Sequence, residues 1–578
     1  MTGVVVDQPL RTRARLAVAA ALERAIAAGA LPPLPGGSDA PPVEVERPAS
    51  AEHGDLATSV ALRLARPLRL PPLRIANALA AELEREAAGE VAAADGRLSV
   101  IGSVAVASPG FVNLRLADAA LAGVVQRLLA HPETWGHVPA ARPRRVNVEF
   151  VSANPTGPLH IGNARGAFVG DLLCRVLEAA GHEVTREYYF NDFGAQVRNL
   201  GASVLAFRTG RPVPEDGYRG AYVADLATAL PAEVLAAAER EEDPAWPIGI
   251  WASEQVRAGI EASLARLGVR FDVWRSEGSL FRDGWVERAI ERLRASGHLY
   301  EQDGALWFRS TDFGDDKDRV VRKSNGDYTY FGSDVGYVVE KFSRGFDRLV
   351  YIWGADHHGT VARLRNAAEA MGYPKADVEM LLIAWVRFVR DGVEVSMSKR
   401  AGEFITLDEL LAEIGVDAAR WFFAARAHTS GIDFDIELAK KQSAENPVYY
   451  VQYAHARIAS ILRKAAAAGL TVPGPGSADE APALSAADLA GAPEAALVRA
   501  LARFPEVVED AALAEETHGI TAFATELATQ FHAFYRDARV VDAAAPQRSR
   551  ARLALVRATQ LTVAAALGLL GISAPESM

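Results

Sequence analysis

The feature that most constrains the fold is a strand, a proline-containing loop and a helix that follow one another directly. Residues 146–151 (VNVEFV) predict a strand by their β-branched content and length. Pro155 and Pro158 then keep the chain extended up to His160, because proline is excluded from a helix interior. The next residues, through Leu173, have the character of a helix. A strand that leads into a helix in this way indicates a layered α/β domain.

Further strands are predicted at residues 184–190 and 348–353, with helical segments between them. Strands that alternate with helices favour a doubly wound, Rossmann-like parallel sheet. Ligands of such sheets bind outside the carboxyl ends of the strands. The residues that directly follow these strands are therefore the first candidates for a functional site.

Proline and glycine clusters divide the chain into three predicted domains. Residues 1–125 contain a helix, a loop and short strands between Ala/Leu helices, which indicates an N-terminal α+β module. Residues 140–407 form the parallel-sheet domain, interrupted by a charged helical insertion at about 200–330. From 408 to 578 the apolar period is almost wholly helical, which predicts an all-α helical bundle.

Composition excludes several classes of protein. The formal net charge of −11 argues against a generally basic nucleic-acid binder, although local basic faces remain compatible with it. One cysteine, Cys174, excludes an intramolecular disulfide and a CxxC zinc site, as expected in a reducing compartment. The N-terminus lacks the apolar core of a signal peptide, and the apolar run at 561–572 is short for a membrane span. We therefore expect a cytoplasmic protein that does not insert into a membrane.

The start of the helix after the first strand has the character of a nucleotide site. Its first turn offers unpaired N–H groups and a positive dipole end to an anion. His160 and Asn163 are three residues apart and share a face, and Gly162 lets a flat ring approach the backbone. On spacing alone, a loop with a solvent-exposed histidine is an equal alternative.

Two other segments add to this hypothesis. In residues 396–402 (SMSKRAG), Lys399 and Arg400 are placed to neutralise charge that develops on a polyphosphate leaving group, although a solvated surface loop is the commoner origin of such a pair. In residues 351–358 (YIWGADHH), Gly354 permits close approach and Asp356 is a candidate acceptor for a ribose hydroxyl. The adjacent His357 and His358 lack carboxylates at ligand spacing, so no metal site is expected there.

Together these motifs resemble class I aminoacyl-tRNA synthetases. The sequence His-Ile-Gly-Asn at 160–163 is similar to their HIGH signature, and Ser-Met-Ser-Lys-Arg at 396–400 is similar to their KMSKS loop. Asn163 and Ser396 replace the usual histidine and lysine. The fuller string SANPTGPLHIGNARGA, the segment YYFNDFG at 188–194 and the DAAR box at 417–420 resemble arginyl-tRNA synthetase in particular. The resemblance runs through nearly the whole chain.

The resemblance implies a set of site residues. His160, Asn163 and Lys399 are the implied catalytic residues. ATP-binding residues are implied at Gly162, Gly354, Asp356, His357, Met397 and Ser398. The implied arginine pocket is lined by Glu149, Ser152, Asn154, Tyr330 and Asp334.

Residue chemistry is compatible with an arginine pocket. A guanidinium needs planar carboxylate acceptors, and Glu149 is out of place in a buried parallel strand unless it has a partner. Tyr330 and Asp334 are four residues apart, so one helical turn would place them on one face. The alternative for Asp334 is that Ser333-Asp334 caps a helix.

The implied reaction is the ATP-dependent ligation of L-arginine to tRNA(Arg). The arginine carboxylate attacks the α-phosphate of Mg-ATP, which gives arginyl-adenylate and pyrophosphate. A ribose hydroxyl of the tRNA then takes the aminoacyl group and releases AMP. The cofactors expected are ATP and Mg²⁺, and the family suggests a monomer whose N-terminal module contacts the tRNA.

The C-terminal helices are expected to read the anticodon. Tyr449, Tyr453 and Arg457 form a stripe at i, i+4 and i+8 on a predicted helix. Unstacked RNA bases are recognised by aromatic faces and arginine. The alternative is that some of these tyrosines, among them Tyr450, only pack within the bundle.

Three competing functions are weighed against this one. A class I synthetase for cysteine would need a thiolate-bound zinc, which a chain with only Cys174 cannot easily build. A non-catalytic paralogue predicts loss of His160, Gly162 or Lys399, and all three are present. A ligase for a non-tRNA acceptor would more naturally lack the C-terminal helical domain.

Overall fold

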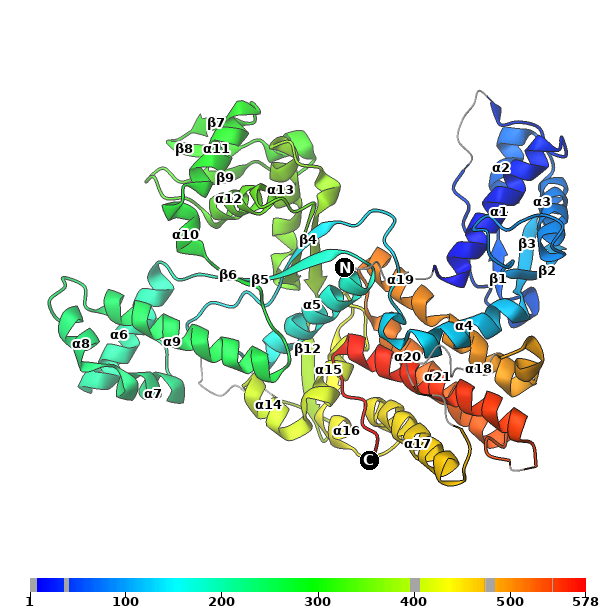
Figure 1. Ribbon diagram of the computed structural model, residues 1–578. Helices are drawn as coiled ribbons and strands as arrows, with labels where there is room; N and C mark the ends of the chain where they lie inside the picture. The colour runs from blue at the N-terminus through cyan, green and yellow to red at the C-terminus, as the bar shows by residue number, and fades with distance from the viewer. Residues whose placement is uncertain (1–7, 36–40, 396–405, 472–473, 475–483, 543) are drawn as a thin grey trace.

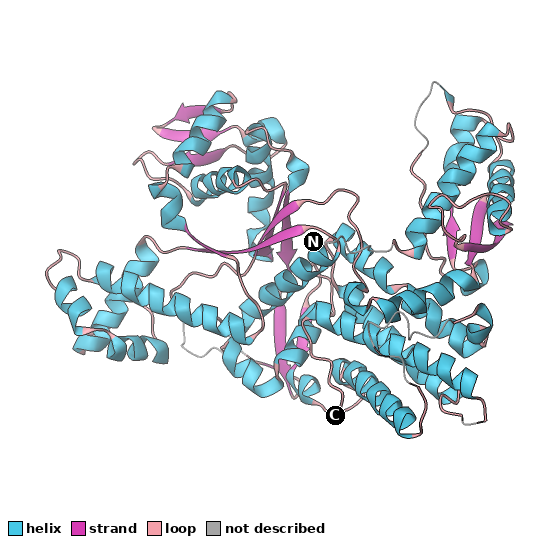
Figure 2. Ribbon diagram, viewed as in Figure 1, coloured by secondary structure: helices cyan, strands magenta, loops and turns pink. Residues whose placement is uncertain are grey.

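The computed structural model describes the whole chain except residues 1–7, 36–40, 396–405, 472–473, 475–483 and 543. Three regions follow one another along the chain, and Figure 1 shows them around one central helix, α5 (Ile161–Ala179). Figure 2 shows that helices dominate and that the strands gather in a few small sheets. The predicted combination of an N-terminal α+β module, a parallel-sheet domain and a helical C-terminal domain is confirmed.

The N-terminal region packs helices against a three-stranded antiparallel sheet of order β1-β3-β2. Its elements are α1 (Leu10–Ala27), β1 (Leu56–Thr58), α2 (Val60–Leu68), α3 (Pro72–Ala87), β2 (Ile101–Ala107), β3 (Phe111–Leu116) and α4 (Asp118–Ala130). The helix and the short strands that the sequence predicts within residues 1–125 are both found here.

The central sheet has five parallel strands in the order β11-β10-β4-β5-β6. Its strands are β4 (Arg145–Glu149), β5 (Glu183–Phe190), β6 (Val273–Ser276), β10 (Arg348–Gly354) and β11 (Val378–Ile383). Three of them coincide with the strands predicted at 146–151, 184–190 and 348–353. Order reverses at β4, which follows the doubly wound pattern and places ligands at the carboxyl ends of β4 and its neighbours.

The stretch at 200–330 contains more than helices. It holds α6 (Ala195–Thr209), α7 (Ala221–Ala229), α8 (Ala232–Ala238), α9 (Ala245–Arg266), α10 (Glu277–Arg282) and α11 (Trp285–Ala295). It also contributes the edge strand β6 and a separate antiparallel sheet of β7 (Leu299–Gln302), β8 (Ala305–Phe308) and β9 (Arg319–Arg322). Helices α12 (Tyr330–Ser343) and α13 (His358–Ala370) then flank β10.

The C-terminal region is a helical bundle with one strand at its start. Strand β14 (Ile432–Asp435) pairs in parallel with β12 (Val386–Arg390), which also pairs with β13 (Val393–Glu394). The predicted, almost wholly helical C-terminal domain is confirmed, and β14 is the exception among its described residues, because Ile432 and Phe434 alternate with Asp433 and Asp435 and bury only one face. The helices are α14 (Leu407–Ile414), α15 (Val416–Ala424), α16 (Ile436–Lys440), α17 (Pro447–Ala467), α18 (Ala492–Ala502), α19 (Phe504–Ala514), α20 (His518–Asp537) and α21 (Pro546–Leu570).

The apolar run at 561–572 belongs to α21, which is longer than the run itself. Among the described helices, α21 is long and apolar enough to cross a membrane, as the bent pair α7 and α8 would be together. In α21, 67% of the most apolar window is buried inside the structure. This is the behaviour of a core helix in a bundle.

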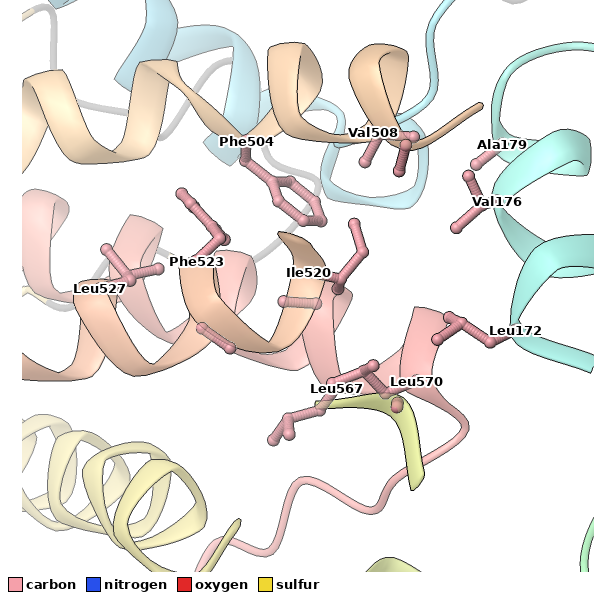
Figure 3. Packing of buried hydrophobic residues seen from close by; sticks show 14 of the residues in the cluster. Leu172, Val176, Ala179, Phe504, Val508, Ile520, Phe523, Leu527, Leu567 and Leu570 are labelled. Atoms are coloured by element: carbon pink, nitrogen blue, oxygen red, sulfur yellow. The ribbon is translucent and has the colours of Figure 1, made fainter. Parts of the chain in front are cut away.

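Helix α5 joins the parallel sheet to the C-terminal bundle through an apolar interface. Leu172, Val176 and Ala179 of α5 face side chains of three bundle helices, as Figure 3 shows. The bundle side chains labelled there are Phe504, Val508, Ile520, Phe523, Leu527, Leu567 and Leu570. All of them are buried, so the position of α5 depends on the bundle.

A buried ion pair reinforces this junction. Arg420 of the DAAR box lies 2.8 Å from Asp171 of α5, measured from Nη1 to Oδ2, and both side chains are 2% exposed. The same guanidinium donates to the carbonyl oxygens of Leu267, after α9, and Leu570, at the end of α21. One side chain thus ties α5, α9, α15 and α21 together.

We predict that Asp171→Asn destabilises the protein by about 3–5 kcal/mol, because it leaves the buried Arg420 without a carboxylate partner. Thermal and denaturant unfolding would measure the change. The matched control is Arg387→Met, which breaks the solvent-exposed pair with Asp433 and is expected to have a much smaller effect on stability. Equal effects of the two substitutions would contradict a special role of the buried pair.

Candidate active site

A cavity of about 1600 Å³ opens at the carboxyl edge of the parallel sheet. Its walls come from the loop after β4, the first turn of α5, the start of α12, the end of β10 and the residues after β11. Residues 215–219, between α6 and α7, and Tyr222, in the first turn of α7, close another side. The cavity therefore lies where a doubly wound sheet is expected to bind its ligands.

The loop between β4 and α5 is held in a strained conformation. Val151 and Ser152 have φ angles of 67° and 43°, which side chains rarely adopt, and β-branched residues least of all. Hydrogen bonds from neighbouring elements support the loop: Ala153 and Tyr188 exchange two, and the Tyr222 hydroxyl donates to the Thr156 carbonyl over 2.9 Å. Strain that the surroundings enforce in this way is common at functional sites.

One end of the cavity is the N-terminus of α5. His160 is the N-cap residue, and its backbone N–H donates to Asn163 Oδ1 over 3.2 Å. A side chain at Gly162 would place its Cβ 2.8 Å from the His160 ring, so glycine is needed there to leave that ring in place. The predicted residues His160, Gly162 and Asn163 thus lie together in the wall, with the helix dipole directed at the cavity.

The turn after β10 lies on the same wall. Gly354, Asp356 and His357 line the cavity and are exposed to it. A Cβ at Gly354 would lie 2.4 Å from Asp356 Oδ1, so only glycine leaves that carboxylate room. Among the residues that the structure describes, no group of three or more His, Cys, Asp or Glu side chains could hold a metal ion.

The other end of the cavity carries three carboxylates. Glu149 ends β4, Asp334 lies in the second turn of α12, and Glu277 begins α10. Burial raises the pKa of Asp334 to about 7; Arg363 opposes the shift, whereas Glu149 and Glu277 add to it. Burial likewise raises the pKa of Glu277, against hydrogen bonds from Ser333 and Tyr189. A site that penalises its own negative charges favours a cationic ligand.

Glu149 differs from the other two carboxylates because it has an internal cation. Lys341 of α12 is fully buried, and its Nζ lies 2.6 Å from Glu149 Oε2. The other oxygen, Oε1, accepts a hydrogen bond from the Ser152 hydroxyl over 3.2 Å. Burial raises the pKa of Glu149, and the contact with Lys341 opposes this shift. The partner that the sequence could not identify is Lys341.

The remaining residues predicted for this pocket also line the cavity. Tyr330 is 73% exposed at its mouth. Asn154 is exposed and donates from Nδ2 to Gln196 Oε1 over 2.7 Å, so α6 orients it. The alternative that Asp334 caps a helix is wrong: Thr329 is the N-cap of α12, and its hydroxyl accepts from the Gly332 N–H.

Two groups of predicted residues are not among the cavity-lining residues. Met397, Ser398 and Lys399 fall outside the described residues. Tyr449, Tyr453 and Arg457 lie on α17, away from the cavity lining.

On α17, Tyr453 is 43% exposed, and the Arg457 guanidinium stacks 4.7 Å from the Tyr535 ring. Tyr450 packs against the bundle core, as the alternative for one of these tyrosines foresaw.

The sequence patterns did not indicate that Glu277 and Lys341 belong to this site. Glu277 follows β6, a strand that the pattern did not predict, so its place at the sheet edge could not be inferred. Lys341 shares a face of α12 with Tyr330, Asp334 and Tyr337, at helical spacings of four, three and four. Extending that face beyond Asp334 would have identified it.

Family models match most of the chain. The model of the arginyl-tRNA synthetase N-terminal domain matches residues 13–116, and that of the class I (R) tRNA synthetase catalytic domain matches 124–209 and 250–433. The model of the DALR anticodon binding domain matches 451–578.

Individual proteins agree with the models. The arginine–tRNA ligase of Syntrophotalea carbinolica is 46% identical over 93% of this chain and 95% of its own length. That of Citrifermentans bemidjiense is 44% identical over 93% and 96%. The structure of Thermus thermophilus arginyl-tRNA synthetase superposes with a TM-score of 0.75 at 24% identity, over 98% of this chain and 100% of that one.

The raised pKa of Asp334 predicts a pH dependence of stability. An acid whose pKa is about 7 when folded and ordinary when unfolded costs stability as the pH rises from about 4 to 7, and the cost is complete above 7. Asp334→Asn should therefore make the protein more stable than the parent at pH 8, and the advantage should vanish near pH 4. Thermal unfolding across this range would measure it. Asp356→Asn, which removes an exposed carboxylate of the same cavity, is the control and should show no such pH-dependent gain.

Proposed function

The chain belongs to the arginyl-tRNA synthetase family and ligates L-arginine to tRNA(Arg) through an arginyl-adenylate, and from that premise we propose which of its residues carry each part of the reaction. The observation that carries the proposal is a cavity that has three carboxylates, Glu149, Glu277 and Asp334, at one end and the N-terminus of α5 at the other. A guanidinium suits the first end, and a phosphate chain suits the second. Arginine and ATP would then meet between them.

The arginine end comprises the residues expected from the sequence and one more. Asp334 and Glu277 bind the guanidinium, because both are carboxylates whose pKa burial raises and which a ligand cation would stabilise. Glu149 and Ser152 bind the α-amino end, and Asn154 and Tyr330 complete the wall. These roles are supported by position in the cavity and by charge.

The nucleotide end is assigned to α5 and the turn after β10. His160 and Asn163 stabilise the phosphates as the arginine carboxylate attacks the α-phosphorus and pyrophosphate leaves. Gly162, Gly354, Asp356 and His357 accommodate the adenosine. Lys399, with Met397 and Ser398, closes over the pyrophosphate; this part of the proposal is supported by the sequence motif alone.

Magnesium is proposed to arrive with ATP. Mg²⁺ is usually held by substrate phosphates and by only one or two carboxylates, so it needs no dedicated protein cage. The exposed Asp356 is a carboxylate of suitable type at the nucleotide end. The ion supplies positive charge to the phosphates, while the residues above orient the two substrates.

The assignments outside the cavity are also proposals. Tyr449, Tyr453 and Arg457 on α17 would contact the anticodon. The N-terminal module would contact another part of the tRNA. We propose domain limits of 1–125, 140–407 and 408–578, a monomeric state and a cytoplasmic location without membrane insertion.

We predict that Asp334→Asn raises the KM for arginine in tRNA charging by about 10- to 100-fold, since a hydrogen bond to a charged group is worth about 1.5–3 kcal/mol. Acid-precipitable [¹⁴C]arginine would be counted over a range of arginine concentrations. The KM for ATP should stay within about twofold. If instead the KM for arginine were unchanged, the guanidinium would not bind at Asp334.

We predict that His160→Ala lowers kcat by about 100- to 1000-fold, the usual loss when one preorganised donor is removed from a transition state. Its effect on folding should be limited to about 1 kcal/mol from the lost N-cap. The control is His131→Ala, an exposed position after α4, which should leave charging intact. Retention of kcat in His160→Ala would remove the histidine from the reaction.

A further inference from the structure

Lys341 is a buried cation whose position the proposed reaction does not yet explain. It lies outside the cavity lining, on the same face of α12 as Asp334 but two turns further along. Its ammonium nitrogen is 4.2 Å from the centre of the Tyr337 ring and 3.9 Å from that of the Tyr351 ring. A fully buried ammonium is costly unless it is paired, and its ion pair is with Glu149.

The groups around Lys341 are otherwise occupied with one another. Glu187, the second carboxylate nearby, accepts from Asn147 Nδ2 over 2.7 Å and pairs with Arg344 over 2.7 Å. Tyr337 also donates its hydroxyl to Glu187. Glu149 is thus the carboxylate that both contacts Lys341 and reaches the cavity. Tyr337 and Tyr351 also contact Lys341 and line the cavity, but Glu149 is the charged group through which Lys341 can act on a ligand.

The ion pair limits what Glu149 can bind. Its Oε2 is engaged by Lys341 Nζ, so one oxygen, Oε1, remains for the cavity, beside the Ser152 hydroxyl. A guanidinium is bound best by both oxygens of a carboxylate in a planar, two-bond arrangement. An ammonium is a compact charge that a single oxygen can accept. Arginine carries one group of each kind. Asp334 is opposed in part by Arg363, and burial raises the pKa of both Asp334 and Glu277, so these two carboxylates remain suited to a ligand cation.

We propose that Lys341 is a positioning residue: by holding one oxygen of Glu149, it reserves Glu149 for the α-ammonium group of arginine and directs the guanidinium to Asp334 and Glu277. The inference rests on the arginine pocket proposed above. The contact with Lys341 also lowers the pKa of Glu149 against the effect of burial, as the weaker hydrogen bond from Ser152 does. The lysine therefore sets the direction in which the substrate lies, with its carboxylate toward the phosphates.

The test compares arginine with 5-guanidinopentanoate, which is arginine without its α-amino group. Dissociation constants would be measured by calorimetry on the full chain without ATP, for the parent and for Lys341→Met. In the variant, Glu149 loses the cation that opposes the effect of burial, so its pKa rises further and its attraction for the ammonium weakens. We expect arginine to bind about 10- to 100-fold more weakly, while the affinity for the analogue changes by less than about twofold.

A pH series separates positioning from a structural effect. In Lys341→Met the affinity for arginine should recover as the pH rises and Glu149 ionises, whereas a distorted pocket would not recover. The matched control is Arg344→Met, one turn away on α12, which removes a cation from Glu187 but not from Glu149. It should leave the ratio of the two affinities unchanged.

Two further variants complete the test. The double variant Lys341→Met/Glu149→Gln removes both members of the buried pair, so it tests the positioning role even if Lys341→Met alone does not fold. It should lower the affinity for arginine but not the affinity for the analogue, and the affinity for arginine should not recover at high pH. Asp334→Asn should weaken both ligands. If Lys341→Met weakens both ligands equally, the positioning role is wrong while the pocket stands. If Asp334→Asn weakens neither, the pocket itself is wrong.

Discussion

The structure depends on the packing of α5 against the C-terminal bundle. One end of this helix carries His160 and the cavity wall, and its flank contributes Leu172 and Val176 to the apolar interface. The buried pair of Asp171 with Arg420 fixes the helix to the same bundle. Because packed interiors do not deform continuously, a displacement of the bundle would displace the first turn of α5 as well. The domain that matches the anticodon-binding model and the proposed nucleotide site are thereby mechanically joined.

The arginine end is organised by charge balance. Glu149, Asp334 and Glu277 lie together at one end of the cavity, and burying their charges is costly unless the charges are compensated. Lys341, which lies outside the cavity lining, compensates Glu149, and Arg363 compensates Asp334 in part. The charge that remains matches the cation of the substrate. We propose that selectivity for arginine follows from this remaining negative charge.

Local patterns predicted much of the fold and many of the residues that line the cavity. The strands β4, β5 and β10 and the loop before α5 follow from short-range periodicity and proline placement, which do not depend on distant residues. Glu277 and Lys341 are placed by contacts between residues that are distant in the sequence, such as Glu149 and Lys341, which are 192 positions apart, and no local pattern encodes these contacts. The alternative of a cap at Ser333-Asp334 is wrong for a related reason: Thr329 and Ser333 are both good caps, and the close packing of Gly332 against Val321 and Tyr328 suits a helix that begins at Tyr330.

The central claim is that one cavity binds the arginyl and adenylyl groups at opposite ends. A crystal structure with a non-hydrolysable arginyl-adenylate analogue tests it most directly. The account predicts the guanidinium between Asp334 and Glu277, the α-ammonium at Glu149 and the phosphate mimic at the N-terminus of α5. A guanidinium paired with Glu149, or a phosphate mimic away from His160, would contradict it.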